Sequence, residues 1–381
     1  MRSEWDMKFV GSGAEALDVL DSEPFQVVVS DMRMPGMDGA QLLNEVLKRH
    51  PQIVRIVLSG YSDKELIMRA VGATHQYLSK PCEPDTLKQA VTSALSLHEL
   101  LHDEPSLMPL IARVEKLPSL PSLYSEVVQE LQAPEPSMPK VAQIITQDPA
   151  MAAKVLQLVN SALFNLRARV TDLRRAVSLM GLEAIKSLVL SAKVFAEFDS
   201  KSMGGLSMEE LWTHSATVGN VAKRICVEER ADKEVTSNAM TAGLLHDVGK
   251  LLLAVNLTEE YCRVREMAEL QGYSLSRVEE LEFGATHAGL GAYLLGIWGL
   301  PEPIVQAVAF HHDPDHGAAT GSFNAIAAVH VANALFHEER GDDEFSDGLD
   351  LDYLEILGVV DRLPRWRELC AEVMHNDQAA A

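Results

Sequence analysis

Along the first hundred residues, short apolar runs alternate with amphipathic stretches. The runs at 25–30, 53–59 and 76–79 are each about the length of one buried strand. Between them, residues 39–50 and 62–71 show the apolar spacing that is typical of helices. This alternation predicts an α/β domain with a doubly wound parallel sheet, a flavodoxin-like arrangement.

Beyond about residue 106 the pattern has the period of helices throughout, which predicts an all-α domain. The last of the larger predicted helices, 179–195, is apolar along one side and is expected in the core. An acidic, glycine-bearing stretch at 337–350 is expected to be a solvated loop. The larger helices are predicted at 122–132, 139–146, 150–162 and 179–195, and short closing helices at 351–357 and 366–374.

A connector joins the two parts. Residues 83–99 read as a helix whose apolar stripe packs on its own domain, and the same stripe could pair two chains into a homodimer. The expected division is an α/β domain at 1–100, a linker at 101–109, a helical domain at 110–335, and an acidic loop with closing helices at 336–381.

Charge and cysteine content narrow the partners and the compartment. The chain has 33 Lys and Arg against 55 Asp and Glu, a net charge of −22, which disfavours direct binding to nucleic acid or to an anionic membrane. No apolar run is long enough to span a bilayer. The four cysteines form no CxxC pair and read as reduced thiols, which predicts a cytoplasmic protein.

Polar residues stand where the predicted strands end. Asp31, Ser59 and Lys80 each follow a strand, and Tyr77 lies three residues before the lysine. In open parallel sheets, ligands bind beyond these carboxyl ends. Asp31 could therefore accept a phosphoryl group while Ser59 and Lys80 bind its oxygens. Taken alone, Asp31 would more simply be a turn or helix-cap residue.

The motifs SDMRMPGMDG, LSG and YLSKP resemble a response-regulator receiver domain. The resemblance implies that Asp31 is the phosphoacceptor, that Ser59, Tyr77 and Lys80 are switch residues, and that a sensor histidine kinase is the phosphodonor. Departing from the family, the chain opens at MRSEWDMKFV, which matches a receiver's second strand, so the first strand, first helix and Mg²⁺-binding acidic pair are missing.

Two interpretations of this departure stay open. Either the chain continues upstream of Met1 in a longer receiver, which we favour, or the domain is a degenerate docking module. Mg²⁺ is expected at the receiver only if the missing strand is present. The 381-residue chain is not expected to be phosphorylated normally.

The helical part carries histidines that could hold a metal. They are His214, His246 next to Asp247, His287, and the pair His311–His312. Several imidazoles with one carboxylate are what a transition-metal site requires, and iron, manganese or another divalent ion would suit. Each histidine taken singly is more often a hydrogen-bonded core residue.

The stretches LPSLP, ITQDPAMAAKVLQLVNSALF, AGLLHDVGK and VAFHH resemble the HDOD output domain, a relative of HD phosphohydrolases. The resemblance maps a metal site onto His214, His246, Asp247 and Asn333, where an amide replaces a carboxylate and should weaken binding. Dinuclear relatives add positions that match His287, His311 and His312. The HHDPDHG segment lacks the GYP signature of cyclic-dinucleotide phosphodiesterases.

These features predict a two-component response regulator whose non-catalytic HDOD domain acts through contacts with a downstream signalling protein. The alternative is a metal-dependent phosphohydrolase acting on a cyclic dinucleotide or another nucleotide, and a third reading is a metal-free nucleotide sensor. Lys250 could bind phosphate or cap a helix. Glu279, Glu280 and Glu282 precede His287 and could be outer partners of the ligands or a solvated face, and we favour the solvated face.

Overall fold

A computed structural model of the chain divides into two compact units. One comprises Met1–Leu120 with Tyr293–Glu302, and the other comprises Pro121–Ala292 with Pro303–Ala381. The residues that the structure describes are 5–50, 53–59, 74, 76–82, 84, 87–88, 90–92, 94–95, 107–114, 122–131, 133, 135–147, 151–152, 155, 173–196, 205–317, 322–341 and 347–380.

The N-terminal unit holds a parallel sheet with the strand order β1-β2-β3, which confirms the predicted α/β class. Asp31 at the end of β1 is in register with Leu58, and Ser59 at the end of β2 is in register with Ser79. The carboxyl ends of the strands therefore meet at one edge. The elements are α1 (Gly13–Ser22), β1 (Val27–Asp31), α2 (Gly39–Arg49), β2 (Val54–Ser59), β3 (Gln76–Ser79) and α5 (Leu107–Arg113).

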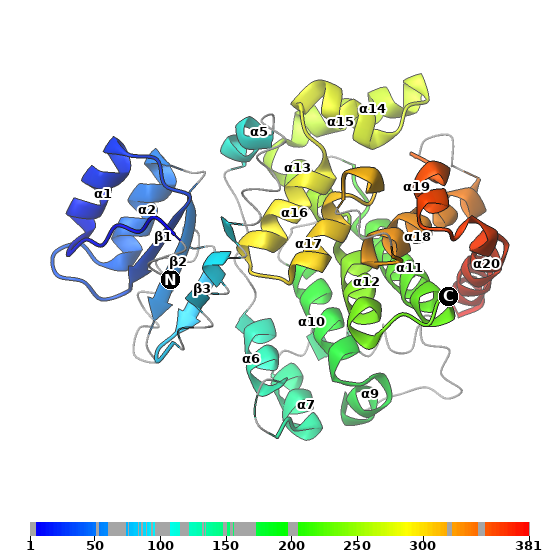
Figure 1. Ribbon diagram of the computed structural model, residues 1–381, viewed down its shortest axis with the longest axis horizontal. Coiled ribbons are helices and arrows are strands. Elements are labelled where there is room, and N and C mark those ends of the chain that lie inside the picture. Colours follow the sequence, from blue (N-terminus) through cyan, green and yellow to red (C-terminus); the bar gives the residue numbers. More distant parts are fainter. Residues whose placement is uncertain are drawn as a thin grey trace. The chain divides into compact units, whose positions relative to one another are not determined.

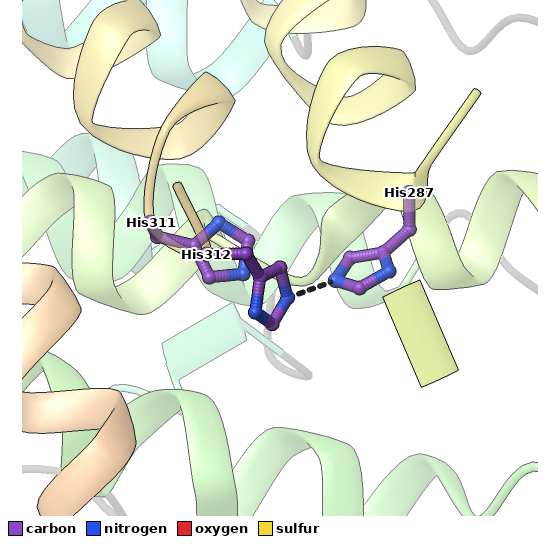
Figure 2. Close-up of side chains that lie close together, drawn as sticks. All are labelled: His287, His311 and His312. Atoms are coloured by element: carbon purple, nitrogen blue, oxygen red, sulfur yellow. Dashed lines mark hydrogen bonds between the residues drawn. The ribbon is translucent and has the colours of Figure 1, made fainter. Parts of the chain in front are cut away.

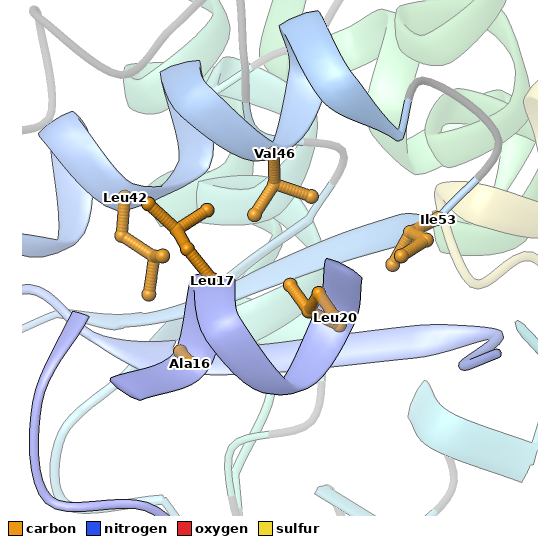
Figure 3. Close-up of a cluster of buried hydrophobic side chains, with 6 residues drawn as sticks. All are labelled: Ala16, Leu17, Leu20, Leu42, Val46 and Ile53. Atoms are coloured by element: carbon orange, nitrogen blue, oxygen red, sulfur yellow. The ribbon is translucent and has the colours of Figure 1, made fainter. Parts of the chain in front are cut away.

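Helices α1 and α2 begin at side-chain caps and pack together. Ser12 caps α1, and Asp38 forms a capping box with Gln41 at the start of α2. The two helices face each other through small and branched apolar side chains, as Figure 3 shows. This cluster is made by Ala16, Leu17, Leu20, Leu42, Val46 and Ile53.

The start of the chain differs from the prediction. Residues 5–10 were expected to match a receiver's second strand, but they form no strand, because a strand needs a hydrogen-bonded neighbour. Among the strands that the structure describes, β1 pairs only with β2. The predicted helix at 62–71 lies outside the described residues, and of the predicted connector helix only 84, 87–88, 90–92 and 94–95 are described, all helical.

The described chain beyond residue 120 is built of helices, as predicted, and all of it except Tyr293–Glu302 belongs to the second unit. Helix α11 packs against α12 and α18, and α12 also packs against α10 (Figure 1). The helices are α6 (Ser122–Leu131), α7 (Met138–Thr146), α9 (Leu173–Met180), α10 (Leu182–Ala196), α11 (Met208–Glu228), α12 (Lys233–Leu245), α13 (Val248–Asn256), α14 (Thr258–Gln271), α15 (Leu275–Phe283), α16 (His287–Ile297), α17 (Glu302–Ala309), η3 (Pro314–His316), α18 (Ala325–Arg340), α19 (Leu351–Ile356), η5 (Val360–Arg362) and α20 (Leu363–Ala380).

Caps fix where the central helices start. The side chains of Ser207, Asp232 and Asn324 accept hydrogen bonds from the first turns of α11, α12 and α18, respectively. The three helices bury most of their middle residues against one another. Among the described residues, no helix has the length and apolarity needed to cross a membrane.

One helix boundary in this unit differs from the prediction. The apolar run predicted at 179–195 divides at Gly181, whose φ of 78° ends α9, so Leu179 belongs to α9 and is half exposed. The run after the glycine forms α10, whose middle is buried. Most of the helix predicted at 150–162 lies outside the described residues.

Candidate phosphoacceptor site and metal centre

The parallel sheet brings the predicted receiver residues together. Asp31 Oδ2 accepts a hydrogen bond from Lys80 Nζ, and Asp31 Oδ1 accepts one from the backbone N–H of Arg33 at 3.1 Å. The Lys80 backbone N–H donates to the Ser59 carbonyl at 2.7 Å. The backbone of Tyr77 lies in β3, but its side chain is outside the described residues. Asp31, Ser59 and Lys80 therefore meet at one edge of the sheet.

Asp31 is accessible and charged. The side chains of Asp31 and Lys80 are 43% and 40% exposed. Partial burial would raise the pKa of Asp31, but the bonds from Lys80 and Arg33 hold it below its ordinary value. A Cβ at Gly39 would overlap the Asp31 carbonyl, so the glycine allows α2 to start directly against the acceptor strand. The carboxylate is thus ionised and accessible, with a neighbouring cation.

In the helical unit, a first group of candidate ligands lies between α11 and α13. His214 is in the middle of α11, and His246 and Asp247 lie between α12 and α13. The Nε2 atoms of His214 and His246 are 3.0 Å apart, and each of them lies 3.3 Å from Asp247 Oδ2. All three side chains are buried.

A second group adjoins the first. His287 opens α16, and His311 and His312 follow α17. Figure 2 shows the imidazole of His312 facing that of His287, with His311 alongside. The Nε2 atoms of His287 and His312 are 3.0 Å apart. His287 and His311 are buried, whereas the His312 side chain is 18% exposed.

Asp247 joins the two groups through its two oxygens. Oδ2 faces the first group and also accepts from Lys250 Nζ at 2.8 Å. Oδ1 lies 3.2 Å from His287 Nε2 and 3.9 Å from His311 Nε2. One carboxylate therefore touches both groups, as a ligand shared by two metal ions would.

Hydrogen bonds at the outer nitrogens set the tautomers of four imidazoles. Nδ1 of His246 donates to the Gly243 carbonyl and Nδ1 of His311 donates to the Val308 carbonyl, both at 2.8 Å. Nδ1 of His287 lies 2.6 Å from Glu279, and Nδ1 of His312 lies 2.6 Å from Asp347. Because each Nδ1 carries the proton, each neutral ring turns a bare Nε2 inward.

The inward nitrogens fit a metal ion. His287 and His312 place two Nε2 lone pairs against each other at 3.0 Å, which is repulsive unless a proton or a cation lies between them. Two nitrogens can adopt this separation when both bind one ion at about 2.1 Å. Among the described residues, His311 Nε2 is buried and has no hydrogen-bond partner, and Asp247 Oδ1 faces the Nε2 atoms of His287 and His311, as the ligand atoms of a metal ion would.

The electrostatics favour neutral imidazoles at His214 and His311 beside an ionised Asp247. Burial lowers the pKa of His214 to about 3 and lowers that of His311 well below its ordinary value. Burial would also lower the pKa of His287, but the Glu279 carboxylate raises it above the usual range. Despite a burial penalty that would raise it, the pKa of Asp247 is held well below normal by its His and Lys neighbours.

Glu279 corrects the sequence interpretation. It was expected on a solvated face with Glu280 and Glu282, which are indeed exposed, but Glu279 is fully buried and binds both the ring and the backbone N–H of His287. Its position four residues from both Leu275 and Phe283, on one helical face, is a signal that could have identified it.

Asp347 contacts the second group of candidate ligands. It lies in the stretch that was predicted to be a solvated loop, yet its carboxylate binds His312. No periodic pattern in the sequence marks Asp347 as a contact of the site.

Asn333 is buried in α18, and among the described residues its Oδ1 has no hydrogen-bond partner. Phe336 and His337, three and four residues further on, have rings that contact the His214 ring, so Asn333 lies on the helix face toward the first group.

A close approach of two helices positions His287 beside Asp247. A Cβ at Gly249 in α13 would overlap the carbonyl oxygen of His287 and approach Gly291, so only glycine permits this contact. The start of α16 is thereby held against the turn that carries Asp247. Lys250, on the same turn, binds Asp247 rather than acting only as a helix cap.

Comparisons with known proteins agree with this two-part organisation. A family model described as the HDOD domain matches residues 117–314, and one described as the response regulator receiver domain matches residues 2–92. Among solved structures, an HDOD domain protein of unknown function from Geobacter sulfurreducens matches 77% of this chain and 98% of its own, with a TM-score of 0.57 at 24% identity. At that identity, the likeness shows the fold.

Curated relatives match one part or the other. An uncharacterised protein of Treponema pallidum is 26% identical over 207 residues, 54% of this chain and 39% of that protein. The hydrogenase transcriptional regulatory protein HoxA of Cupriavidus necator is 41% identical over 102 residues, 26% of this chain and 21% of HoxA. The Escherichia coli regulator NtrC is 37% identical over 89 residues, 23% of this chain and 19% of NtrC. The chain thus spans less than half the length of each of these relatives.

Proposed function

Because this chain belongs to the HDOD family and carries a response-regulator receiver domain ahead of its HDOD domain, we propose that the state of the Asp31 face controls a metal-holding HDOD domain that acts through protein contacts. The receiver implies a phosphodonor such as a histidine kinase. The exposed Asp31–Lys80 pair supports input at this edge of the sheet, because it presents an ionised nucleophile and a cation that can bind phosphate oxygens.

The observation that carries the metal assignment is the convergence of unprotonated nitrogens on one carboxylate. His214, His246 and Asp247 would hold one divalent ion, and His287, His311 and His312 a second, with Asp247 shared. Glu279 and the backbone carbonyls that bind the outer nitrogens keep the rings turned inward. When bound, such ions supply positive charge and Lewis acidity inside the domain.

Burial favours a role in holding the domain over a role in turnover. His246, His287 and His311 are at most 1% exposed, and His214 is 8% exposed, so most of the ligand set lies inside the domain, where an ion would bind helices to one another. A bound cation would join α11 and α16, which carry His214 and His287, to the turn between α12 and α13, which carries His246 and Asp247. The outer surface of that helical core would then contact the downstream partner.

Elemental analysis of protein purified without chelator or affinity metal tests this proposal. We expect one to two equivalents of iron, manganese or another transition metal per chain, lost in His246→Ala. Glu280→Ala removes an exposed side chain from α15 and serves as the control that keeps its metal. A folded, metal-free wild-type protein would contradict the metal-holding role.

A second candidate function, hydrolysis of a phosphoester, is favoured by one specific observation. His312 and Lys250 are the partly exposed members of the centre, with side chains 18% and 15% exposed, so phosphate could approach on their side. In that case the ligand set would hold the metal, which would supply Lewis acidity and a more acidic bound water, while Lys250 could bind a phosphate oxygen. The water oxygen would bond to phosphorus as the ester P–O bond breaks, and the leaving oxygen would take up a proton from the water. Turnover of a cyclic dinucleotide by metal-loaded protein, lost in Asp247→Ala, would establish this function, whereas metal content without turnover supports the holding role.

A further inference from the structure

A short segment beyond the matched HDOD region reaches the second group of ligands. Residues 347–350, here called the clasp, lie outside the family match, which ends at residue 314. The Asp347 carboxylate lies 2.6 Å from His312 Nδ1 and accepts a 2.6 Å hydrogen bond from Ser276 Oγ at the start of α15. The clasp thereby links α15 to the most exposed ligand.

The other end of the clasp is tied to His311. The backbone N–H of Asp350 donates to His330 Nε2 at 2.9 Å, and His330 Nδ1 donates to the His311 carbonyl, also at 2.9 Å. His330 is 2% exposed, so both of its nitrogens are satisfied within the protein. The side chain of Asp350 also caps α19 through the Tyr353 N–H. Both histidines that follow α17 are therefore positioned from the clasp.

In the described part of the chain, the first group of ligands makes no hydrogen bond with residues 347–350. His246 is fixed by the Gly243 carbonyl on its own helix, and Asp247 by Lys250 one turn away. The contact of Asp347 is with His312 alone among the candidate ligands. The two halves of the centre thus differ in what holds them.

We propose that Asp347 is a positioning residue that sets the affinity of the second metal position, which makes that position dependent on the C-terminal helices. This inference rests on the proposed metal-holding function and adds its regulation. By accepting the Nδ1 proton of His312, Asp347 keeps Nε2 unprotonated and aimed at His287. Any partner or event that pulls residues 347–350 away would release the second ion first and leave the first ion bound.

A calorimetric titration of chelator-treated, full-length protein with Mn²⁺ tests whether Asp347 sets the affinity of the second metal position. For the wild type we expect two binding steps. In Asp347→Asn the second step should weaken by about 10- to 100-fold, the usual cost of losing an outer partner of a ligand, while the first changes by less than about threefold. Ser276→Ala, which keeps the carboxylate, should weaken the second step less. Asp352→Asn, an exposed acid in α19, is the charge-matched control.

The outcomes separate the two proposals. If wild-type protein binds two equivalents and Asp347→Asn leaves the second step unchanged, the clasp is overturned and the metal centre stands. If wild-type protein binds no Mn²⁺, the metal centre is overturned and the clasp with it. A readout without metal is the ¹⁵N NMR signal of His312, which should show a proton on Nδ1 in the wild type and a tautomer mixture in Asp347→Ala.

Discussion

The two units each contain an Asp–Lys ion pair, and the two pairs differ mainly in burial. Asp31 and Lys80 are 43% and 40% exposed at the edge of the sheet. Asp247 and Lys250 are 1% and 15% exposed among helices. In both pairs the pKa of the aspartate lies below its ordinary value. The same chemical pair therefore occurs once where partners can reach it and once where they cannot.

This difference explains why one pair suits signalling and the other suits metal. An exposed pair contributes little to stability, so its charge can be altered by phosphorylation without unfolding the domain. A buried carboxylate is costly unless several cationic or hydrogen-bonding groups compensate it, and under the proposed function a bound metal would add to that compensation. Here Lys250, His214 and His246 all face Asp247 Oδ2. The predictions below test this contrast.

The largest effect is expected from Asp247→Asn. The change removes the carboxylate that both groups share and leaves the Lys250 charge without its Asp247 partner. We therefore expect loss of metal and a fall of about 3 kcal/mol in the free energy of unfolding of metal-free protein. Metal analysis and denaturant unfolding with chelator measure the two effects. Retained metal with unchanged stability would show that the buried pair is not essential.

A slightly smaller effect is expected from Gly249→Ala. The added methyl group would overlap the His287 carbonyl, and overpacking of this kind costs about 1–3 kcal/mol and moves α16 away from Asp247. Metal affinity should fall with stability. Gly181→Ala is the matched control, because its positive φ is strained but nothing lies within 4 Å of the new Cβ. Equal metal affinity in the two variants would contradict a positioning role for Gly249.

Mild acid should weaken the helical unit. His214, with a pKa of about 3, and His311, with a pKa well below normal, stay neutral in the fold because of burial. As the pH falls below about 6.5, these histidines gain a proton in the unfolded chain before they do so in the folded protein. The free energy of unfolding therefore declines by about 1.4 kcal/mol per pH unit for each of them. His287, with its raised pKa, adds stability that is already complete at pH 6.5.

Denaturant unfolding of metal-free protein between pH 7 and 5 measures this slope. His214→Gln should reduce it, because the variant removes one group that must remain neutral when folded. A free energy of unfolding that stays constant or rises over this range would show that the buried imidazoles take up protons without cost. That result would contradict the claim that burial keeps them neutral in the folded protein.

The contrast between the units also shows what could be predicted from the sequence. The meeting of Asp31, Ser59 and Lys80 follows from three strand ends in a parallel sheet, so the strand pattern was sufficient. The adjacent residues His246 and Asp247 were equally easy to identify as one candidate group.

The full metal centre needed the packing. The resemblance had already grouped His214 with His246 and Asp247, but no spacing in the sequence encodes the contact itself, which forms because α11 lies along α12. Glu279 was misplaced because its neighbours Glu280 and Glu282 are charged and exposed. Asp347 lies in an aperiodic acidic stretch, where position depends entirely on tertiary contacts. The periodic parts of the chain were therefore predictable, and the outer contacts of the ligands were not.

The smallest effect on stability, less than about 1 kcal/mol, is expected from Asp31→Asn, because its partner Lys80 is exposed. Its effect on chemistry should be complete, because the amide cannot accept a phosphoryl group. Asp18→Asn, an exposed acid on α1, is the control that keeps any labelling.

Labelling of this 381-residue chain by a small phosphodonor is nevertheless expected to be slow, with little response to Mg²⁺. Within the part of the chain that the structure describes, the groups able to hold a metal lie in the helical unit, and none includes Asp31. Lys80 can bind phosphate oxygens, but one ammonium offsets less of the developing charge than an ammonium with a divalent ion. Rapid, Mg²⁺-dependent labelling that is lost in Asp31→Asn would show that carboxylates outside the described residues complete this site. The exposed pair would then also be a metal site, and burial alone would no longer distinguish the two.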